Sequence, residues 1–68
     1  MFRSNTRRAR RIRAAVDALP EPQALVFRLH AGEGQEYARI ADRLGVSPAE
    51  VERLLADALV AIDRHLGS

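Results

Sequence analysis

The sequence predicts a small all-α domain of four helices, and three observations lead to this fold class. Hydrophobic residues make up 47% of the chain, but it has only two Phe, one Tyr and no Trp, so its core is aliphatic and suits helices. Apolar residues recur three or four positions apart in four segments, as along one side of a helix. Gly and Pro gather at three places between those segments, 19–22, 32–34 and 44–48.

Length and composition restrict what the chain is able to do. A domain of 68 residues buries only about 60% of the surface of its unfolded chain, so its core is modest. The absence of Cys excludes disulfides and thiolate metal sites. No apolar run approaches the roughly 20 residues that a membrane-spanning helix needs, and the first residues lack the apolar stretch of a signal peptide. We therefore expect a cytoplasmic protein that does not bind membranes.

The first two helices are expected over residues 7–18 and 22–31. The apolar side of the first comprises Ala9, Ile12, Ala15, Val16 and Leu19. Pro22 suits the first turn of the second helix, where its missing N–H is not needed. The buried side of that helix comprises Leu25, Val26 and Leu29, with Phe27 beside them. Gly32 and Gly34 are able to take the left-handed dihedrals that end a helix.

The third helix is expected over residues 35–44 and the fourth over 48–66. The third has Tyr37, Ile40, Ala41 and Leu44 on one side. The apolar stripe of the fourth comprises Val51, Leu54, Leu55, Ala58, Leu59, Ile62 and Leu66. Its start has the residues of a capping box, an N-cap Ser47 followed by Pro48 at the first helical position and Glu50 at the third.

A short helix, a three-residue turn with Gly and a capped longer helix form a helix-turn-helix unit. Ala41 stands where the two helices cross closely, and Gly45 supplies the positive φ of the turn. Val46 is expected to pack the pair onto the core. The fold therefore resembles a homeodomain-like three-helix core without a wing, preceded by an N-terminal helix.

In such a unit the second helix enters the major groove of DNA by its N-terminal turns. The residues expected to face DNA there are Ser47, Pro48, Ala49, Glu52 and Arg53. Arg53 would contact guanine O6 and N7, or would instead be a solvated arginine paired towards Asp57. Glu52 would accept from cytosine N4, or would repel phosphate as a free carboxylate. Glu50 is expected to cap the helix and to contact nothing else.

Further contacts are expected on the sugar–phosphate backbone. Ser47 and the free N–H groups of the first turn would hold a phosphate at the positive end of the helix dipole. Gln35, Tyr37 and Arg39 open the preceding helix, and Arg43 lies near the turn. Tyr37 has an equal alternative as a half-buried core residue with a solvated hydroxyl.

Charge divides the chain unevenly. Residues 1–13 contain six Arg and no acid, and residues 14–68 contain five Arg and nine acids. Six like charges close together favour a polyanionic partner, so Arg7, Arg8 and Arg11 are expected to contact DNA. This Arg-rich segment, 1–11, either extends the first helix or forms an arm that reaches a groove. Residues 12–68 form the helix-turn-helix domain.

Catalytic and metal-binding chemistry finds no support in the sequence. His30 and His65 lie far apart without neighbouring ligand residues, and their places near helix ends explain them. No Ser–His–Asp set, paired carboxylates or Gly-rich phosphate loop occurs. We expect no enzyme activity, no cofactor and no metal.

The residues quoted above resemble region 4 of bacterial sigma-70-type initiation factors, most closely the extracytoplasmic-function group. The resemblance runs from Ile12 to Leu66. It rests on Leu19 and Pro20 before the second helix, on 34–47 through the turn, and on 51–59, which is similar to the iron-uptake branch. It implies recognition of the −35 promoter element and docking on the β flap of RNA polymerase. By position, Ser47, Ala49, Glu52 and Arg53 would face the promoter.

Two departures from that family leave alternatives open. The chain lacks region 2, which binds the polymerase clamp and melts the −10 element, so it is not a complete sigma factor. Its recognition helix is acidic, with Glu50 and Asp57 where the family commonly has neutral or basic residues. The alternative is a sigma-mimic module that binds the β flap or an anti-sigma factor without tight DNA binding. A homodimer and a fragment of a longer factor are further expectations, and Met1 weighs mildly against the fragment.

Overall fold

The chain forms four α-helices and no strand within residues 2–67, which this computed structural model describes, with side chains from residue 7 onward. The helices are α1 (Phe2–Asp17), α2 (Glu21–Phe27), α3 (Tyr37–Leu44) and α4 (Pro48–Gly67). A π-helical turn, η1 (Arg28–Gly32), continues α2. The predicted all-α class and the order of four helices are confirmed.

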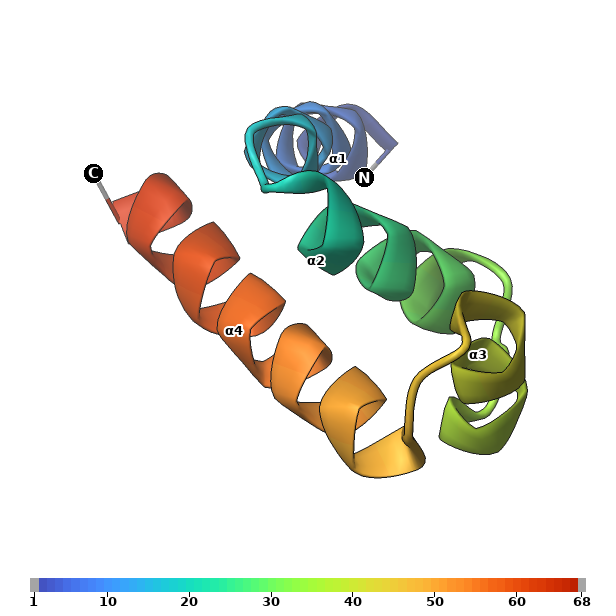
Figure 1. The fold of residues 1–68 in the computed structure, drawn as a ribbon. Helices are drawn as coiled ribbons and strands as arrows, with labels where there is room; N and C mark the ends of the chain where they lie inside the picture. Colours follow the sequence, from blue (N-terminus) through green and yellow to red (C-terminus); the bar gives the residue numbers. More distant parts are fainter. Residues whose placement is uncertain (1, 68) are drawn as a thin grey trace.

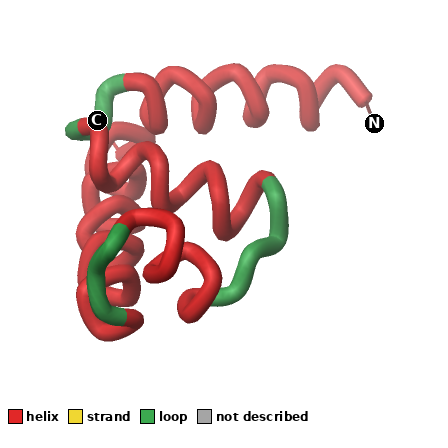
Figure 2. Tube along the Cα trace, turned by 45° about the vertical axis from the view of Figure 1, so that its right-hand side comes forward, coloured by secondary structure: helices red, strands yellow, loops and turns green. Residues whose placement is uncertain are grey.

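The long helix α4 runs along one side of the molecule, and the other helices pack against it at different heights (Figure 1). α3 lies beside the start of α4, α2 packs along its middle, and α1 crosses near its C-terminal end. The radius of gyration, 12.7 Å, exceeds the roughly 11 Å expected for a compact chain of this length. Figure 2 shows the reason, because the N-terminal part of α1 extends beyond the other helices.

The N-terminal helix starts earlier than predicted. It begins at Phe2, five residues before the expected start, because no helix breaker stands before Arg7 and arginine is a good helix former. The described part of the Arg-rich segment, residues 2–11, is therefore the first part of α1 and not a separate arm. Of the two expected arrangements, the structure has the helical extension.

The end of the second helix widens into η1, and this shifts the start of the third. The N–H of Glu33 donates to the carbonyl oxygen of Arg28 at 3.1 Å, and the N–H of Gln35 donates to that of Leu29 at 3.0 Å. Gly34, at φ 68°, allows the chain to turn back in this way. Gln35 is thus part of the loop, and α3 begins at Tyr37, two residues later than predicted.

Two groups of buried side chains hold the helices together. The first lies under the helix-turn-helix unit and comprises Val26, Leu29, Ile40, Ala41, Val51 and Leu55. The second joins α1 to α2 and α4 and comprises Ala15, Val16, Ala24 and Ile62. α2 contributes to both groups, so it fixes α1 relative to the turn. An exposed ion pair between Arg28 and Asp17, at 3.1 Å, also links α1 to η1.

Three residues expected in the core are exposed. Ala9 is exposed on α1, where it lines an open groove together with Phe27 and Gly32. Val46 is 38% exposed because it follows Gly45 in the turn. Leu59 is 51% exposed, because it comes one position after the fully buried Ala58 and so points about 100° away from that side.

Candidate nucleic-acid interface

The turn between α3 and α4 has the geometry that the sequence predicts. Gly45 adopts φ 71° and ψ 33° at the end of α3, which is the left-handed conformation. The N–H groups of Gly45 and Val46 both donate to the carbonyl oxygen of Ala41, at 2.8 and 3.1 Å. Ala41 is itself buried against α4. The turn is therefore closed by backbone hydrogen bonds, and the start of α4 has a fixed direction.

Ser47 caps the start of α4, but the capping box is only half formed. Its Oγ accepts the N–H of Glu50 at 3.1 Å, and its carbonyl oxygen accepts the N–H of Val51 at 3.1 Å. The carboxylate of Glu50 turns to Arg53 and leaves the N–H of Ser47 without it. The expectation that Glu50 contacts nothing else is wrong.

Arg53 is held between two carboxylates of its own helix. Its Nε donates to Glu50 Oε1 at 3.0 Å, a second nitrogen donates to Glu50 Oε2, and a third donates to Asp57 Oδ2 at 3.3 Å. The hydrogen bond from Arg53 holds the pKa of Glu50 below its ordinary value, and the hydrogen bond to Glu50 raises the pKa of Arg53. Glu50 and Arg53 therefore both stay ionised, and the charge of Arg53 is largely compensated where base reading would need it.

The backbone of the first turn of α4 offers little to a phosphate. Pro48 has no N–H, and the N–H of Glu50 is used by the cap. Only the N–H of Ala49 remains without a hydrogen-bond partner in this turn among the described residues. Because anion sites at helix starts use several converging N–H groups, this one is weaker than the sequence suggests.

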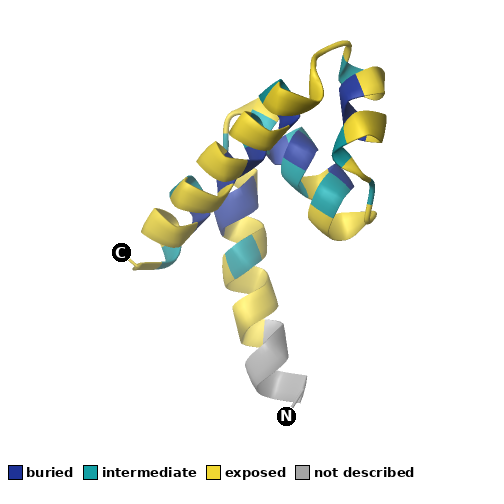
Figure 3. Ribbon diagram, turned by 90° about the horizontal axis from the view of Figure 1, so that it is seen from below, coloured by how far each residue is buried: buried dark blue, intermediate teal, exposed yellow. Residues whose placement is uncertain are grey.

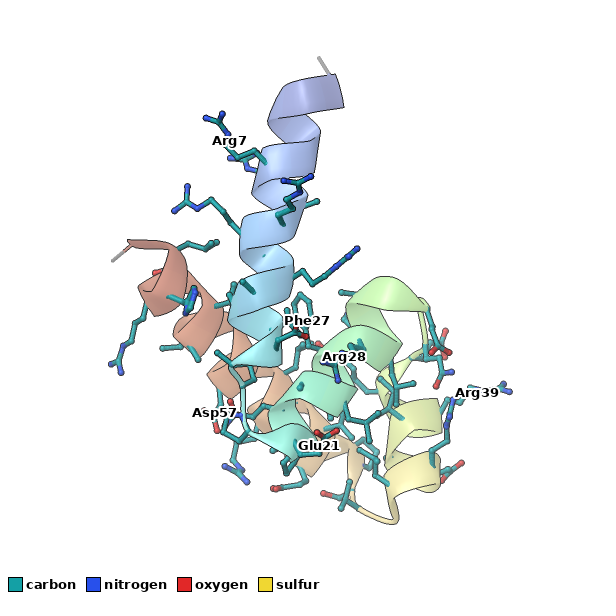
Figure 4. All side chains as sticks on the ribbon, turned by 90° about the horizontal axis from the view of Figure 1, so that it is seen from above. Arg7, Glu21, Phe27, Arg28, Arg39 and Asp57 are labelled. Carbon is teal, nitrogen blue, oxygen red and sulfur yellow. The ribbon has the colours of Figure 1, made fainter. Side chains whose placement is uncertain are left out.

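Arg39 and Arg43 are the unpaired cations of the helix-turn-helix unit. Both side chains are exposed on α3, and neither forms an ion pair with a described carboxylate. Figure 4 shows Arg39 pointing away from the body of the molecule. Ser47, Pro48, Ala49 and Glu52 are also exposed on the adjoining turn and helix start. The structure thus brings most of the predicted DNA-facing residues onto one end of the molecule.

Gln35 and Tyr37 belong to the junction between η1 and α3. The Nε2 of Gln35 donates to Glu33 Oε1 at 3.1 Å, and its Oε1 is buried without a partner among the described residues. The Nδ1 of His30 donates to the carbonyl oxygen of Gln35 at 3.0 Å, and the ring of His30 meets that of Tyr37 at 5.1 Å. The amide of Gln35 is therefore held within the loop, with its oxygen buried, and Tyr37 is the half-buried residue of the second interpretation.

The predicted N-terminal contacts lie at the other end of α4. Arg7 and Arg8 are exposed, and Figure 4 shows Arg7 on the extended part of α1, away from Arg39. Arg11 donates to the carbonyl oxygen of Leu66 at 2.9 Å, which ties α1 to the last turn of α4. Arg11 thus satisfies a helix C-terminus in this structure.

Sequence reasoning missed two parts of this arrangement. The pair of Arg53 with Asp57 was among the expected alternatives, but its pair with Glu50 was not, although Glu50 stands three residues before Arg53 and that spacing predicts an ion pair on a helix. Arg10 and Arg13 are exposed on α1 together with Arg7 and Arg8. The helical extension of the Arg-rich segment is the signal that could have identified them.

Two further features bear on what the described residues are able to bind. No group of three His, Cys, Asp or Glu residues in residues 2–67 is arranged to hold a metal ion. None of the helices described here is both long enough and apolar enough to cross a membrane.

Comparison with known proteins gives one match. No curated protein and no solved structure is significantly similar to the chain. The model of the family described as sigma-70, region 4 matches residues 4–62, which include most of α1, all of α2 and α3, the turn, and α4 as far as Ile62. Domains of this family are non-catalytic and act in promoter recognition or in association with RNA polymerase. The chain belongs to the sigma-70 region 4 family.

Proposed function

We propose that this protein is a sequence-specific transcription regulator or sigma-like factor that contacts a −35-type promoter element in the bacterial cytoplasm. The proposal is carried by one observation, the Ser47-capped start of α4, exposed beside two unpaired arginines, Arg39 and Arg43. A helix start of this kind fits the major groove, and the arginines lie where the backbone of the flanking strand would pass.

Within this proposal, each residue has a distinct role. Arg53 reads a guanine, for which it must exchange at least part of its contact with Glu50 or Asp57. Arg39 and Arg43 neutralise phosphates, and Glu52 accepts from a cytosine amino group. Gln35 is left out of the contact set because its amide is held in the loop.

Charge sets how strongly this end of the molecule binds. Between residues 35 and 57 there are five acids and three arginines. Because phosphate neutralisation dominates affinity for DNA, the helix-turn-helix end alone binds weakly. The arginines of α1 supply the missing charge, but about 20 Å of α4 separates Arg53 from Leu66, where α1 crosses. Arg7 and Arg8 therefore contact a different stretch of duplex from the one that Arg53 reads.

Fluorescence anisotropy with a −35-like duplex and a scrambled duplex, over a range of salt concentrations, tests the proposal. We expect Arg53→Ala to lower the preference for the −35-like duplex on the order of tenfold. Arg39→Ala should weaken binding to both duplexes alike, because it contacts phosphate and reads no base. A wild-type protein whose affinity did not change with salt would contradict DNA binding.

An apolar groove favours a second candidate function, a module that docks on RNA polymerase. The groove lies between α1 and α2–η1, has a volume of about 490 Å³, and is floored by Ile12, Val16 and Phe27. Figure 4 shows Phe27 beneath the end of α1, beside Arg28. A groove of this composition suits the apolar side of an amphipathic helix. The proposed partner is the β flap implied by the resemblance, bound without tight contact to DNA.

Titration with an isolated β-flap domain tests this candidate. Ala9 lines the groove and is exposed, so Ala9→Glu should weaken flap binding without disturbing the core. Ala14→Glu is the matched control, because Ala14 is exposed on α1 and does not line the groove. Equal effects of the two substitutions, or no flap binding at all, would count against docking through this groove.

A further inference from the structure

The outer side of α4 carries exposed apolar side chains. Leu59 and Val60 are 51% and 55% exposed, beside the exposed Ala56. The buried side of the same helix, with Val51 and Ala58 fully inside, faces the body. Figure 3 shows the outer side of α4 exposed along its length. Adjacent large apolar side chains on the solvent side of a small domain indicate a contact surface.

Six of the exposed residues of α4 lie on one stripe along the helix, which we call the seam. They are separated by four, three, four, three and four positions: Ala49, Arg53, Ala56, Val60, Asp63 and Gly67. This alternation keeps one stripe facing a partner helix over its whole length. Ala49 and Gly67 stand at the ends of the stripe, and Ala56 lies near its centre, so that a second helix is able to approach closely. Arg53 lies on one side of the centre, and the oppositely charged Asp63 lies on the other.

We propose that this seam pairs with the same seam of a second copy of the chain, with the two α4 helices antiparallel. In the register that centres the two-fold axis near Ala58, Ala56 faces Val60 of the second copy. Arg53 faces Asp63 of the second copy, and each of these pairs occurs twice because the interface is two-fold symmetric. Leu59 then meets Leu59 of the second copy beside the axis, which covers the most exposed leucine of the helix.

Charge selects this orientation. A parallel pair would set Arg53 against Arg53 and Asp63 against Asp63, and like charges across an interface are unfavourable. The antiparallel register removes both like-charge contacts and sets Arg53, whose charge is already shared with Glu50 and Asp57, against Asp63 of the second copy. Arg53 retains capacity for the new contact, since a guanidinium has five N–H donors and three of them serve Glu50 and Asp57.

The extent of the seam predicts a weak dimer. α4 has 20 residues, about 30 Å of helix, and a single helix pair of this length buries less than the roughly 1,200 Å² of a stable interface. We expect a dissociation constant on the order of 0.1 mM. The dimer covers Ala49 and Arg53, so it excludes the DNA contact proposed above, yet it does not depend on that contact.

Disulfide trapping tests the register, and the chain suits it because it contains no native Cys. In the proposed register the Leu59 side chains of the two copies are neighbours, so Leu59→Cys should give a covalent dimer under mild oxidation. Ala49→Cys is the matched control on the same seam, because its two copies lie about 27 Å apart along the axis. Trapping of both variants, or of neither, would overturn the antiparallel register.

Sedimentation velocity tests the pairing without a cross-link, and it uses no DNA. At about 1 mM chain, a dissociation constant on the order of 0.1 mM gives mostly dimer. Arg53→Glu and Asp63→Arg should each weaken the dimer about tenfold, and the double variant should recover it. Residues 53 and 63 are ten positions apart in one chain, so only a second copy can produce that recovery. A wild-type chain that stays monomeric, or a double variant without recovery, would overturn the proposal, provided circular dichroism shows folded variants.

Discussion

The two ends of α4 differ in what each lacks for binding DNA. At its start, the turn and the Ser47 cap fix the direction of the helix, but Arg53 is compensated by Glu50 and Asp57. At its other end, α1 carries exposed arginines without ion pairs to described carboxylates, but none of the side chains described there lies at the capped start of a helix, where bases are read. Shape and charge, which a DNA-binding helix normally combines, are separated in this protein by the length of α4.

The difference has a physical origin in the core. The helix-turn-helix end is built over fully buried Val26, Ile40 and Val51, whereas the N-terminal part of α1 extends beyond the other helices (Figure 2). One end is therefore rigid because of packing, and the other is held mainly by its own helical hydrogen bonds. Four predictions, two on stability and two on DNA binding, test this contrast between the two ends of α4.

The largest expected effect concerns stability. Ile40 is fully buried, and Ile40→Ala should cost roughly 2–5 kcal/mol, a large part of the stability of so small a domain. Removal of residues 1–8 should leave the fold almost intact, because Arg7 and Arg8, the two residues there whose side chains are described, are exposed and belong to neither buried group. Thermal unfolding followed by circular dichroism measures both. A deletion as costly as Ile40→Ala would show that α1 supports the turn.

The next largest effect concerns binding to DNA of any sequence. Arg7→Ala, Arg8→Ala and Arg10→Ala together should lower duplex affinity at low salt on the order of tenfold or more. The slope of log K against log salt should become shallower by about 0.9 for each phosphate that is no longer neutralised. The matched control replaces the same residues with Lys, which keeps the charge. Unchanged affinity in the Ala variant would remove α1 from the proposed interface.

Much of this contrast could be read from the sequence, because it depends on local signals. Gly45, the Ser47 cap and the spacing from Ile40 to Val51 predict the turn correctly, since each residue acts on its neighbours. The Arg-rich character of α1 is equally evident from composition. The sequence does not show how far the arginines of α1 lie from the turn. Arg11 donates to the carbonyl oxygen of Leu66, which places this part of α1 at the far end of α4.

Two failures have specific causes. The prediction that Leu59 is buried is wrong, because the apolar stripe of α4 is wider than the side of the helix that the other helices cover. The packing of α2 and α3 decides where burial stops, and the sequence of α4 alone does not show it. The π-turn after Phe27 depends on hydrogen bonds from Glu33 and Gln35 back to the helix end. Helical periodicity carries no information about such bonds.

A smaller effect concerns the release of Arg53. Glu50→Gln with Asp57→Asn removes both carboxylates that hold Arg53 and two negative charges near the proposed groove. We expect duplex affinity to rise several-fold, and more for guanine-containing −35-like sites than for scrambled ones. Asp42→Asn is the control, because Asp42 is an exposed acid on α3 that has no part in the ion pairs of Arg53. An equal rise for Asp42→Asn would mean that general charge, and not the release of Arg53, is responsible.

The smallest expected effect concerns stability against pH. The hydrogen bond from Arg53 lowers the pKa of Glu50 in the folded protein, so the ion pair stabilises the fold above the ordinary carboxyl pKa. That contribution is lost as the pH falls from this value through the depressed one, because protonation ends the ion pair. Thermal unfolding across this acidic range should show a steeper loss for the wild type than for Glu50→Gln. Equal slopes would mean that the pair is too exposed to contribute, and Arg53 would then be free to turn to DNA at little cost.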